Sequence, residues 1–225
     1  IGKTTLVINL PKINSFSDGI SKVAWVKDIG YRIIKSISIE INGRTISRHY
    51  GEWMYLYNEL FNTQPDKYNK MIGNIPELTD FTNGKESYTL YIPLQFWFCR
   101  NISARNSSLV FPLCSIYNST IELLIDVRTL NQILTTQDNI LTGAPNLEIT
   151  KGSLYIDYVI LEEQERSLYI KSPRQMNVIN QVQTYTYSIA AGTKEHTFSL
   201  KSMHYPVIEL IFFVRRNDAE GINDY

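Results

Sequence analysis

Alternating apolar and polar positions dominate the start of the chain and predict β-strands. Leu6, Ile8 and Leu10 recur at every second position, so they share one face of an extended segment. Pro11 ends this segment because proline cannot donate a hydrogen bond to a neighbouring strand. The pattern predicts a strand over residues 4–10 with one buried face.

A second alternating segment, in which isoleucine recurs, runs into a turn signal. The dipeptide Asn42-Gly43 suits the positive φ angles of a two-residue type I′ turn. Such a turn places Ile41 opposite Arg44 and Ile39 opposite Ile46, so the isoleucines of the second pair share the apolar face. Turn chemistry and burial therefore both indicate a hairpin.

The apolar period changes between residues 50 and 61. Trp53, Leu56, Tyr57 and Leu60 recur at helical spacing, and Met54 and Phe61 widen the stripe. We interpret this segment as one amphipathic helix packed on a sheet, with the stripe in the core. The polar stretch that follows, residues 62–87, is expected to be a surface loop.

Further apolar segments predict strands at residues 88–99, 109–117, 120–127 and 153–161. Both faces of the segment around Phe96, Trp97 and Phe98 are bulky, which favours a strand covered on two sides. Many short strands with a lone inserted helix indicate an all-β sandwich or a jelly roll and disfavour alternating βαβ units. The candidate structural core is Trp53, Tyr57, Leu60, Phe96, Trp97 and Phe98.

A charged run at residues 162–166 and a possible short helix at 174–180 separate these strands from three more, at 182–189, 197–201 and 207–215. We therefore expect a first domain over residues 1–165, a linker over 166–181, and the beginning of a second β domain over 182–225. The chain opens inside a strand-like pattern without Met, so the first domain is expected to lack its N-terminal strand.

Composition narrows the function classes. The 225 residues are 44% hydrophobic, which is enough for a substantial core, and the 22 basic residues balance the 22 acidic ones. This balance argues against a dedicated nucleic-acid binder. No run approaches the roughly 20 apolar residues of a membrane span, and Cys99 and Cys114 are too few for a disulfide scaffold.

Candidate chemistry is sparse. His49, His196 and His204 are too scattered for a metal site and are expected at the surface or at strand ends. Cys99 follows three aromatic residues, an apolar setting that raises a thiol pKa and leaves the group inert. The tripeptide Gly2-Lys3-Thr4 resembles the end of a phosphate-binding loop, but a strand pattern follows it where that loop needs a helix. The sequence predicts no catalytic residue, metal or cofactor.

Two further features of the sequence concern the protein surface. The acidic residues at 162, 163 and 165 are expected to form a solvated face. Asn101, Asn106 and Asn118 each begin a tripeptide that fits the N-glycosylation acceptor, a short pattern that is common by chance.

Several longer segments of the sequence together resemble a known protein family. The segments are 24–26, 29–30, 34–43, 49–53 and 58–60, then 91–101 and 112–113, and finally 152–161, 165–166 and 179–183. In this order they closely resemble the major capsid proteins of large nucleocytoplasmic DNA viruses, from the first jelly roll into the second. The chain departs from that family at residues 102–108 and 117–120, which leaves open a principal shell protein or a divergent paralogue.

The resemblance implies two tandem jelly rolls, a homotrimer of pseudo-hexagonal outline, and an icosahedral shell. The resemblance also implies that the protein contacts neighbouring capsomers and minor capsid proteins and does not contact nucleic acid directly. It implies a shell that is assembled in the host cytoplasm and a position that is close to an internal membrane but not inserted into it. Function would then be structural, without catalysis. The alternatives are a double-barrel scaffold protein of immature particles, a glycan-binding jelly roll and a metal-dependent enzyme.

Overall fold

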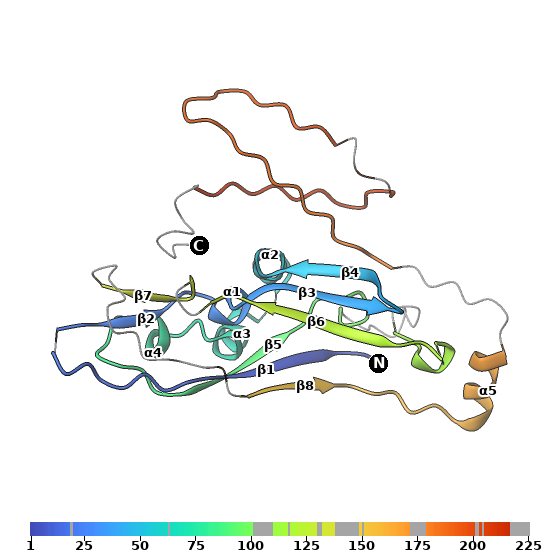
Figure 1. Cartoon of the computed structure of the whole chain (residues 1–225). Helices are drawn as coiled ribbons and strands as arrows, with labels where there is room; N and C mark the ends of the chain where they lie inside the picture. The colour runs from blue at the N-terminus through green and yellow to red at the C-terminus, as the bar shows by residue number, and fades with distance from the viewer. Residues whose placement is uncertain are drawn as a thin grey trace.

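Two three-stranded antiparallel sheets form the body of the protein (Figure 1). The computed structural model describes residues 1–18, 20–62, 64–100, 110–116, 118–129, 132–137, 149, 151–171, 179–200, 203 and 205–216. One sheet has the strand order β5-β1-β8, the other has β4-β3-β6, and β2 pairs separately with β7. The strands are β1 (Thr4–Leu10), β2 (Val23–Trp25), β3 (Ile34–Ile41), β4 (Arg44–Tyr50), β5 (Tyr88–Pro93), β6 (Ile121–Val127), β7 (Leu134–Thr136) and β8 (Gly152–Ile156).

Five helices and the 3₁₀ turn η2 accompany the strands within the described residues. They are α1 (Ile29–Arg32), α2 (Gly51–Phe61), α3 (Pro65–Ile72), α4 (Pro76–Thr79), η2 (Leu113–Ser115) and α5 (Glu163–Lys171). The helix predicted over residues 50–61 is confirmed as α2. The prediction of a loop at 62–87 is wrong in part, because this stretch contains α3 and α4. Both helices begin with proline, which is favoured at the first helical position. The α3 helix ends at Gly73, which has a left-handed conformation.

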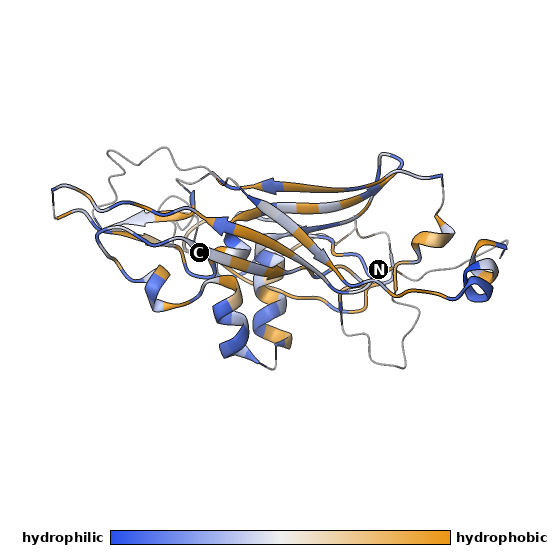
Figure 2. Cartoon of the chain, turned by 90° about the horizontal axis from the view of Figure 1, so that it is seen from below, coloured by the Kyte–Doolittle hydropathy of each residue, from blue (hydrophilic) through white to orange (hydrophobic). Residues whose placement is uncertain are grey.

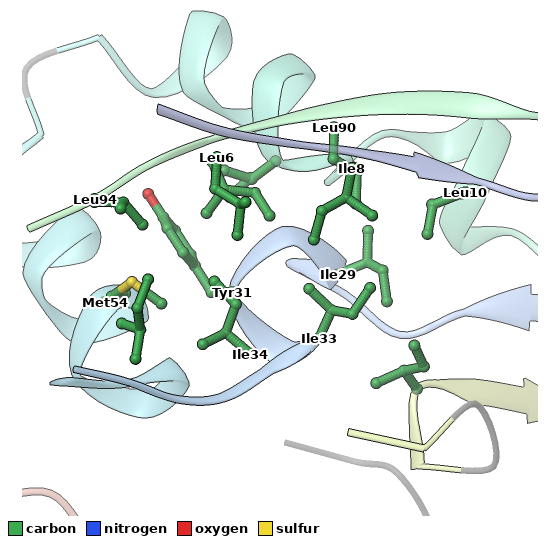
Figure 3. Close-up of a cluster of buried hydrophobic side chains, with 14 of the residues drawn as sticks. Leu6, Ile8, Leu10, Ile29, Tyr31, Ile33, Ile34, Met54, Leu90 and Leu94 are labelled. Carbon is green, nitrogen blue, oxygen red and sulfur yellow. The ribbon is translucent and has the colours of Figure 1, made fainter. Parts of the chain in front are cut away.

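The core lies between the sheets and is closed by α1. Leu6 and Ile8 of β1 point toward Tyr31 and Ile33 in Figure 3, and all four side chains are buried. The strand predicted over residues 4–10 is confirmed as β1. Figure 2 shows apolar positions, in orange, interspersed with polar ones along the strands, the pattern that lets each sheet bury one face.

The predicted hairpin is confirmed, with one change of register. Asn42 and Gly43 have φ of 51° and 75°, and Ile41 faces Arg44. Ile39, however, faces Ser47 and not Ile46, because a β-bulge between Ile39 and Glu40 shifts the pairing by one residue. A bulge puts an extra residue on one strand, so the alternation of apolar residues alone does not reveal it.

Several predicted strands are shorter or absent. β5 ends at Pro93, β8 ends at Ile156, and the described residues 110–116 contain η2 and no strand. The strand predicted at 120–127 is confirmed as β6. The expected linker begins inside α5, and residues 174–178 of the short helix expected at 174–180 lie outside the described part of the chain.

Residues 179–200, 203 and 205–216 contain no paired strand in the structure, so the three strands expected there are not present. The chain nevertheless turns back on itself at residues 190–193, where the Thr193 amide donates to the Ala190 carbonyl. Beyond this turn, the Tyr187 hydroxyl donates to the Ser199 carbonyl at 2.7 Å. A β-ladder needs a continuous series of backbone hydrogen bonds between two segments, whereas the Tyr187 bond comes from a side chain and the Thr193 bond closes the turn itself.

A buried cation joins the second sheet to the helices. Arg128, just after β6, donates from Nη1 to the carbonyls of Arg32 (2.7 Å) and Ile34 (3.1 Å) and from Nη2 to the Glu52 carboxylate. Its side chain is 6% exposed and that of Glu52 is 21% exposed. The interaction therefore fixes the start of α2 against the α1–β3 corner.

Candidate functional site

The aromatic block after β5 lies in the core but is not a strand. Phe96, Trp97 and Phe98 are at most 4% exposed, while residues 96–99 form a tight turn in which the Cys99 amide donates to the Phe96 carbonyl. The strand predicted through Cys99 is therefore wrong beyond Pro93. A turn enclosed by protein on all sides has the same unbroken apolar composition as a buried strand, so composition does not separate the two.

The α2 helix presents a different face to the core from the one predicted. Its buried residues are Gly51, Met54 and Asn58, whereas Trp53 and Tyr57 are half-buried and Leu60 is 56% exposed. Leu60 is thus outside the core, which corrects its assignment as a core residue. The cause is the close approach at Gly51, where a Cβ would lie 2.4 Å from the carbonyl oxygens of Ile34 and Tyr31.

Polar pairing allows this rotation of the helix. Asn58 occupies a core position because its Oδ1 accepts a hydrogen bond from the Asn62 side-chain amide at 3.1 Å. The apolar pattern does not predict this burial, because Asn58 is polar and its hydrogen bond is made at the end of its own helix. The aromatic stripe of α2 is therefore left on the outer side of the helix.

His49 lies near the end of β4, one of the two places expected for it, but it is not at the surface. It is fully buried, its ring stacks on Phe96 with centroids 4.8 Å apart, and its Nε2 lies 3.4 Å from the Ser47 hydroxyl. Burial, with a smaller contribution from the charge of Arg100, lowers the pKa of His49 to about 3. The imidazole is therefore neutral at physiological pH and acts as a packing group. His196 is exposed, and His204 lies outside the described residues.

The cysteines have no catalytic environment. Burial raises the pKa of the Cys99 thiol to about 11, against smaller opposing effects from hydrogen bonds to Thr4. Both Cys99 and Cys114 are free thiols, as expected. A protonated buried thiol is a poor nucleophile, so Cys99 is a packing residue.

Other candidate sites are equally limited. Within the described residues, no group of three or more His, Cys, Asp or Glu side chains could hold a metal ion, and no helix is long and apolar enough to cross a membrane. Thr4 begins a strand, so no helix follows Gly2-Lys3-Thr4 as a phosphate loop requires. Asn118 is exposed in a turn with φ of 63°, while Asn101 and Asn106 lie outside the described residues.

The most distinctive surface feature is exposed apolar area. On β6, Leu124 and Val127 are 47% and 49% exposed, and after β8, Ile160 is 94% exposed. Single exposed apolar residues are common, but these belong to sheet segments and their continuations, where burial is the usual outcome. The remaining large exposed apolar side chains on this part of the chain include Ile121, Leu154, Tyr155, Tyr158, Val159, Leu168, Tyr169 and Ile170.

Two facing antiparallel sheets with an inserted helix form a β-sandwich, and the solved structures that share this arrangement are jelly-roll proteins. The chain is similar to the major capsid protein of Paramecium bursaria Chlorella virus 1, as fitted into the virophage Sputnik, with a TM-score of 0.60 and 20% identity over 81% of this chain and 40% of that one. It is also similar to the Faustovirus major capsid protein, with a TM-score of 0.57 and 11% identity over 76% of this chain and 51% of that one. The predicted all-β jelly-roll class is confirmed.

Sequence comparison gives the family. The family described as "Major capsid protein N-terminus" matches residues 1–162, and the chain belongs to this family. Probable capsid protein 4 of Acanthamoeba polyphaga mimivirus is 45% identical over 57% of this chain and 25% of its own length. The major capsid protein of Phaeocystis pouchetii virus is 29% identical over 95% of this chain and 46% of its own length. The resemblance to capsid proteins of large nucleocytoplasmic DNA viruses is confirmed, and the chain spans less than half the length of these relatives.

Proposed function

We propose that this chain is the N-terminal part of a capsid subunit that forms homotrimeric capsomers of pseudo-hexagonal outline, which tile an icosahedral shell. The family match supports a capsid role. The observation that carries the proposal is the exposed apolar area on β6 and after β8, because such area is stabilising only when another protein surface covers it. Affinity would come from burial between subunits, and no turnover is involved.

The proposed division of the chain follows the strand pattern predicted from the sequence. Residues 1–165 form the first jelly roll, 166–181 connect, and 182–225 begin a second jelly roll. Neighbouring capsomers and minor capsid proteins are the expected partners, in a shell assembled in the host cytoplasm near an internal membrane. The equal numbers of acidic and basic residues fit a subunit that does not contact nucleic acid directly.

The mass of the full-length protein in solution tests this function. Light scattering behind a sizing column is expected to give three times the subunit mass at micromolar concentration. A monomer that persists at the highest soluble concentration would contradict the proposal. Mass spectrometry of purified mature virions separates a shell subunit, which is present in them, from a scaffold protein, which is absent.

A glycan-binding jelly roll is the other candidate retained from the sequence. Its binding site would need exposed aromatic rings on loops. Trp53 and Tyr57 lie on a helix, and Phe96, Trp97 and Phe98 are buried, so these rings do not form such a loop site. A glycan array on the full-length protein is expected to show no binding above background.

A further inference from the structure

The outer face of α2 carries an aromatic stripe that the first domain buries only in part. Trp53, Tyr57 and Phe61 succeed one another along the helix, with ring centroids 5.8 Å apart for the first pair and 4.8 Å for the second. Exposure rises along the helix, from half-buried Trp53 to Phe61, which is 46% exposed, and Leu60, which is 56% exposed. Aromatic rings of this size stabilise a fold or an interface chiefly when they are covered.

Arg100 covers the first part of this stripe. Its guanidinium lies 5.1 Å from the centroid of the Tyr57 ring and 5.7 Å from that of Trp53, and its Nε donates to the Gln95 carbonyl at 3.0 Å. Two donors at this position, Arg100 Nη2 and Trp53 Nε1, are buried and have no hydrogen-bond partner among the described residues. Buried donors without acceptors are costly, particularly when one of them is cationic.

Residues 205–216 bring the matching chemistry to this face. In Figure 1 this segment runs as a red extended trace above α2, and Arg215 Nη1 lies 3.9 Å from Glu52 Oε1 at the start of the helix. Burial lowers the pKa of Arg100, while electrostatic interactions with Tyr57, Cys99 and Glu209 act to raise it, so Glu209 of this segment interacts with the guanidinium. The segment is also rich in uncovered apolar side chains: Val207, Ile208, Leu210, Phe212, Phe213 and Val214.

A third contact holds the chain over the same region. Gln181 Nε2 donates to the carbonyl of Ile46 at 2.5 Å, on the strand that leads into α2. The chain that follows β8 and α5 therefore returns to β4 and α2 at two places, near residues 181 and 215. Arg215 lies against Glu52, and the charge of Glu209 acts on Arg100; opposite charges placed in this way fix the register of an interface.

We propose that the outer face of α2, formed by Glu52, Trp53, Tyr57 and Arg100, is the docking surface for residues 205–216 of this chain. In the docked arrangement the Glu209 carboxylate accepts hydrogen bonds from the unpaired donors of Arg100 and Trp53, and Arg215 pairs with Glu52. The apolar residues of the segment cover Leu60 and Phe61. This docking would fix the chain that follows the linker on the first domain, independently of contacts between subunits.

Hydrogen exchange in the full-length protein tests this docking. Glu209→Lys and Arg215→Glu are each expected to raise amide exchange in peptides covering residues 205–216 and 51–61 by about tenfold, the effect of losing one charge-assisted hydrogen bond. Glu209→Asp, which keeps the charge, is expected to retain most of the protection. Both sites are on an exposed segment, so these substitutions leave the core of the first domain intact.

Matched controls come from the residues that directly follow the turn at 190–193. Lys194→Glu and Glu195→Lys make equal charge changes on exposed residues of the same part of the chain and are expected to leave exchange unchanged. The proposal would be overturned if amide exchange in Glu209→Lys equalled that of the wild type, or if Glu195→Lys raised exchange as much as Glu209→Lys does. The oligomeric mass is measured on the same samples, so loss of docking and loss of subunit assembly are separate results.

Discussion

Replacing Arg128 by Met probes the buried interaction that holds the start of α2 in place. The substitution keeps much of the side-chain volume but removes the donors to two backbone carbonyls, those of Arg32 and Ile34, and to the Glu52 carboxylate. Both carbonyls belong to the α1–β3 corner, against which Gly51 packs without room for a Cβ. Water therefore has little access to replace the lost donors.

The expected loss of stability follows from these three acceptors. Breaking a buried ion pair by removing one partner costs about 3–5 kcal/mol, because the remaining charge is left uncompensated. Glu52 is 21% exposed, so water partly solvates its carboxylate and places the expected loss near the lower limit, about 3 kcal/mol. A loss of that size corresponds to a fall in Tm of about 6–12 °C for a chain of this length.

Urea unfolding followed by tryptophan fluorescence measures this loss. Arg48→Met, on the exposed side of β4, is the matched control and is expected to change stability by less than about 0.5 kcal/mol. Glu52→Gln combined with Arg128→Met should cost less than the sum of the two single changes. Should Arg128→Met prove too unstable to purify, Arg128→Lys keeps the charge without the fork of donors and should show an intermediate loss. A loss below about 1 kcal/mol in Arg128→Met would refute the reasoning.

Three further predictions concern local conformation, pH and burial. Gly43→Ala is expected to cost about 1 kcal/mol in a thermal melt, since φ is +75° and no atom lies within 4 Å of the new Cβ, so only backbone strain contributes. The pKa of His49 falls to about 3 on folding, so between pH 6.5 and pH 3 the unfolded state binds a proton that the native state does not. Urea unfolding midpoints should therefore show stability falling from pH 6.5 toward pH 3, by up to about 1.4 kcal/mol per pH unit from this group. The fall should be less steep in His49→Phe. Trp53→Ala should cost about 3 kcal/mol in a denaturant melt, because Trp53 packs against the core, whereas Leu60→Ala, at a side chain 56% exposed, should cost less than about 1 kcal/mol.

Features that depend on neighbouring residues could be predicted from the sequence. Asn42-Gly43 defines its turn because few other residues adopt two successive positive φ angles, and Leu6, Ile8 and Leu10 define a strand face because the side-chain period of a strand is two. The existence of α2, the inertness of Cys99 and the burial of the Phe-Trp-Phe block depend on similarly local chemistry. The all-β class followed from the number and spacing of such segments, and the jelly roll from the resemblance to a known family.

Tertiary packing decided which way these elements face. The bulge next to Glu40, the rotation of α2 onto Gly51, Met54 and Asn58, and the turn that replaces a strand after Pro93 each depend on how close two backbones approach. The burial of His49 and the proximity of Arg215 to Glu52 join residues from separate elements. Local sequence determines which backbone conformations have low free energy. The choice among these conformations depends on steric and electrostatic contacts between residues distant in the chain, and a local pattern does not contain those contacts.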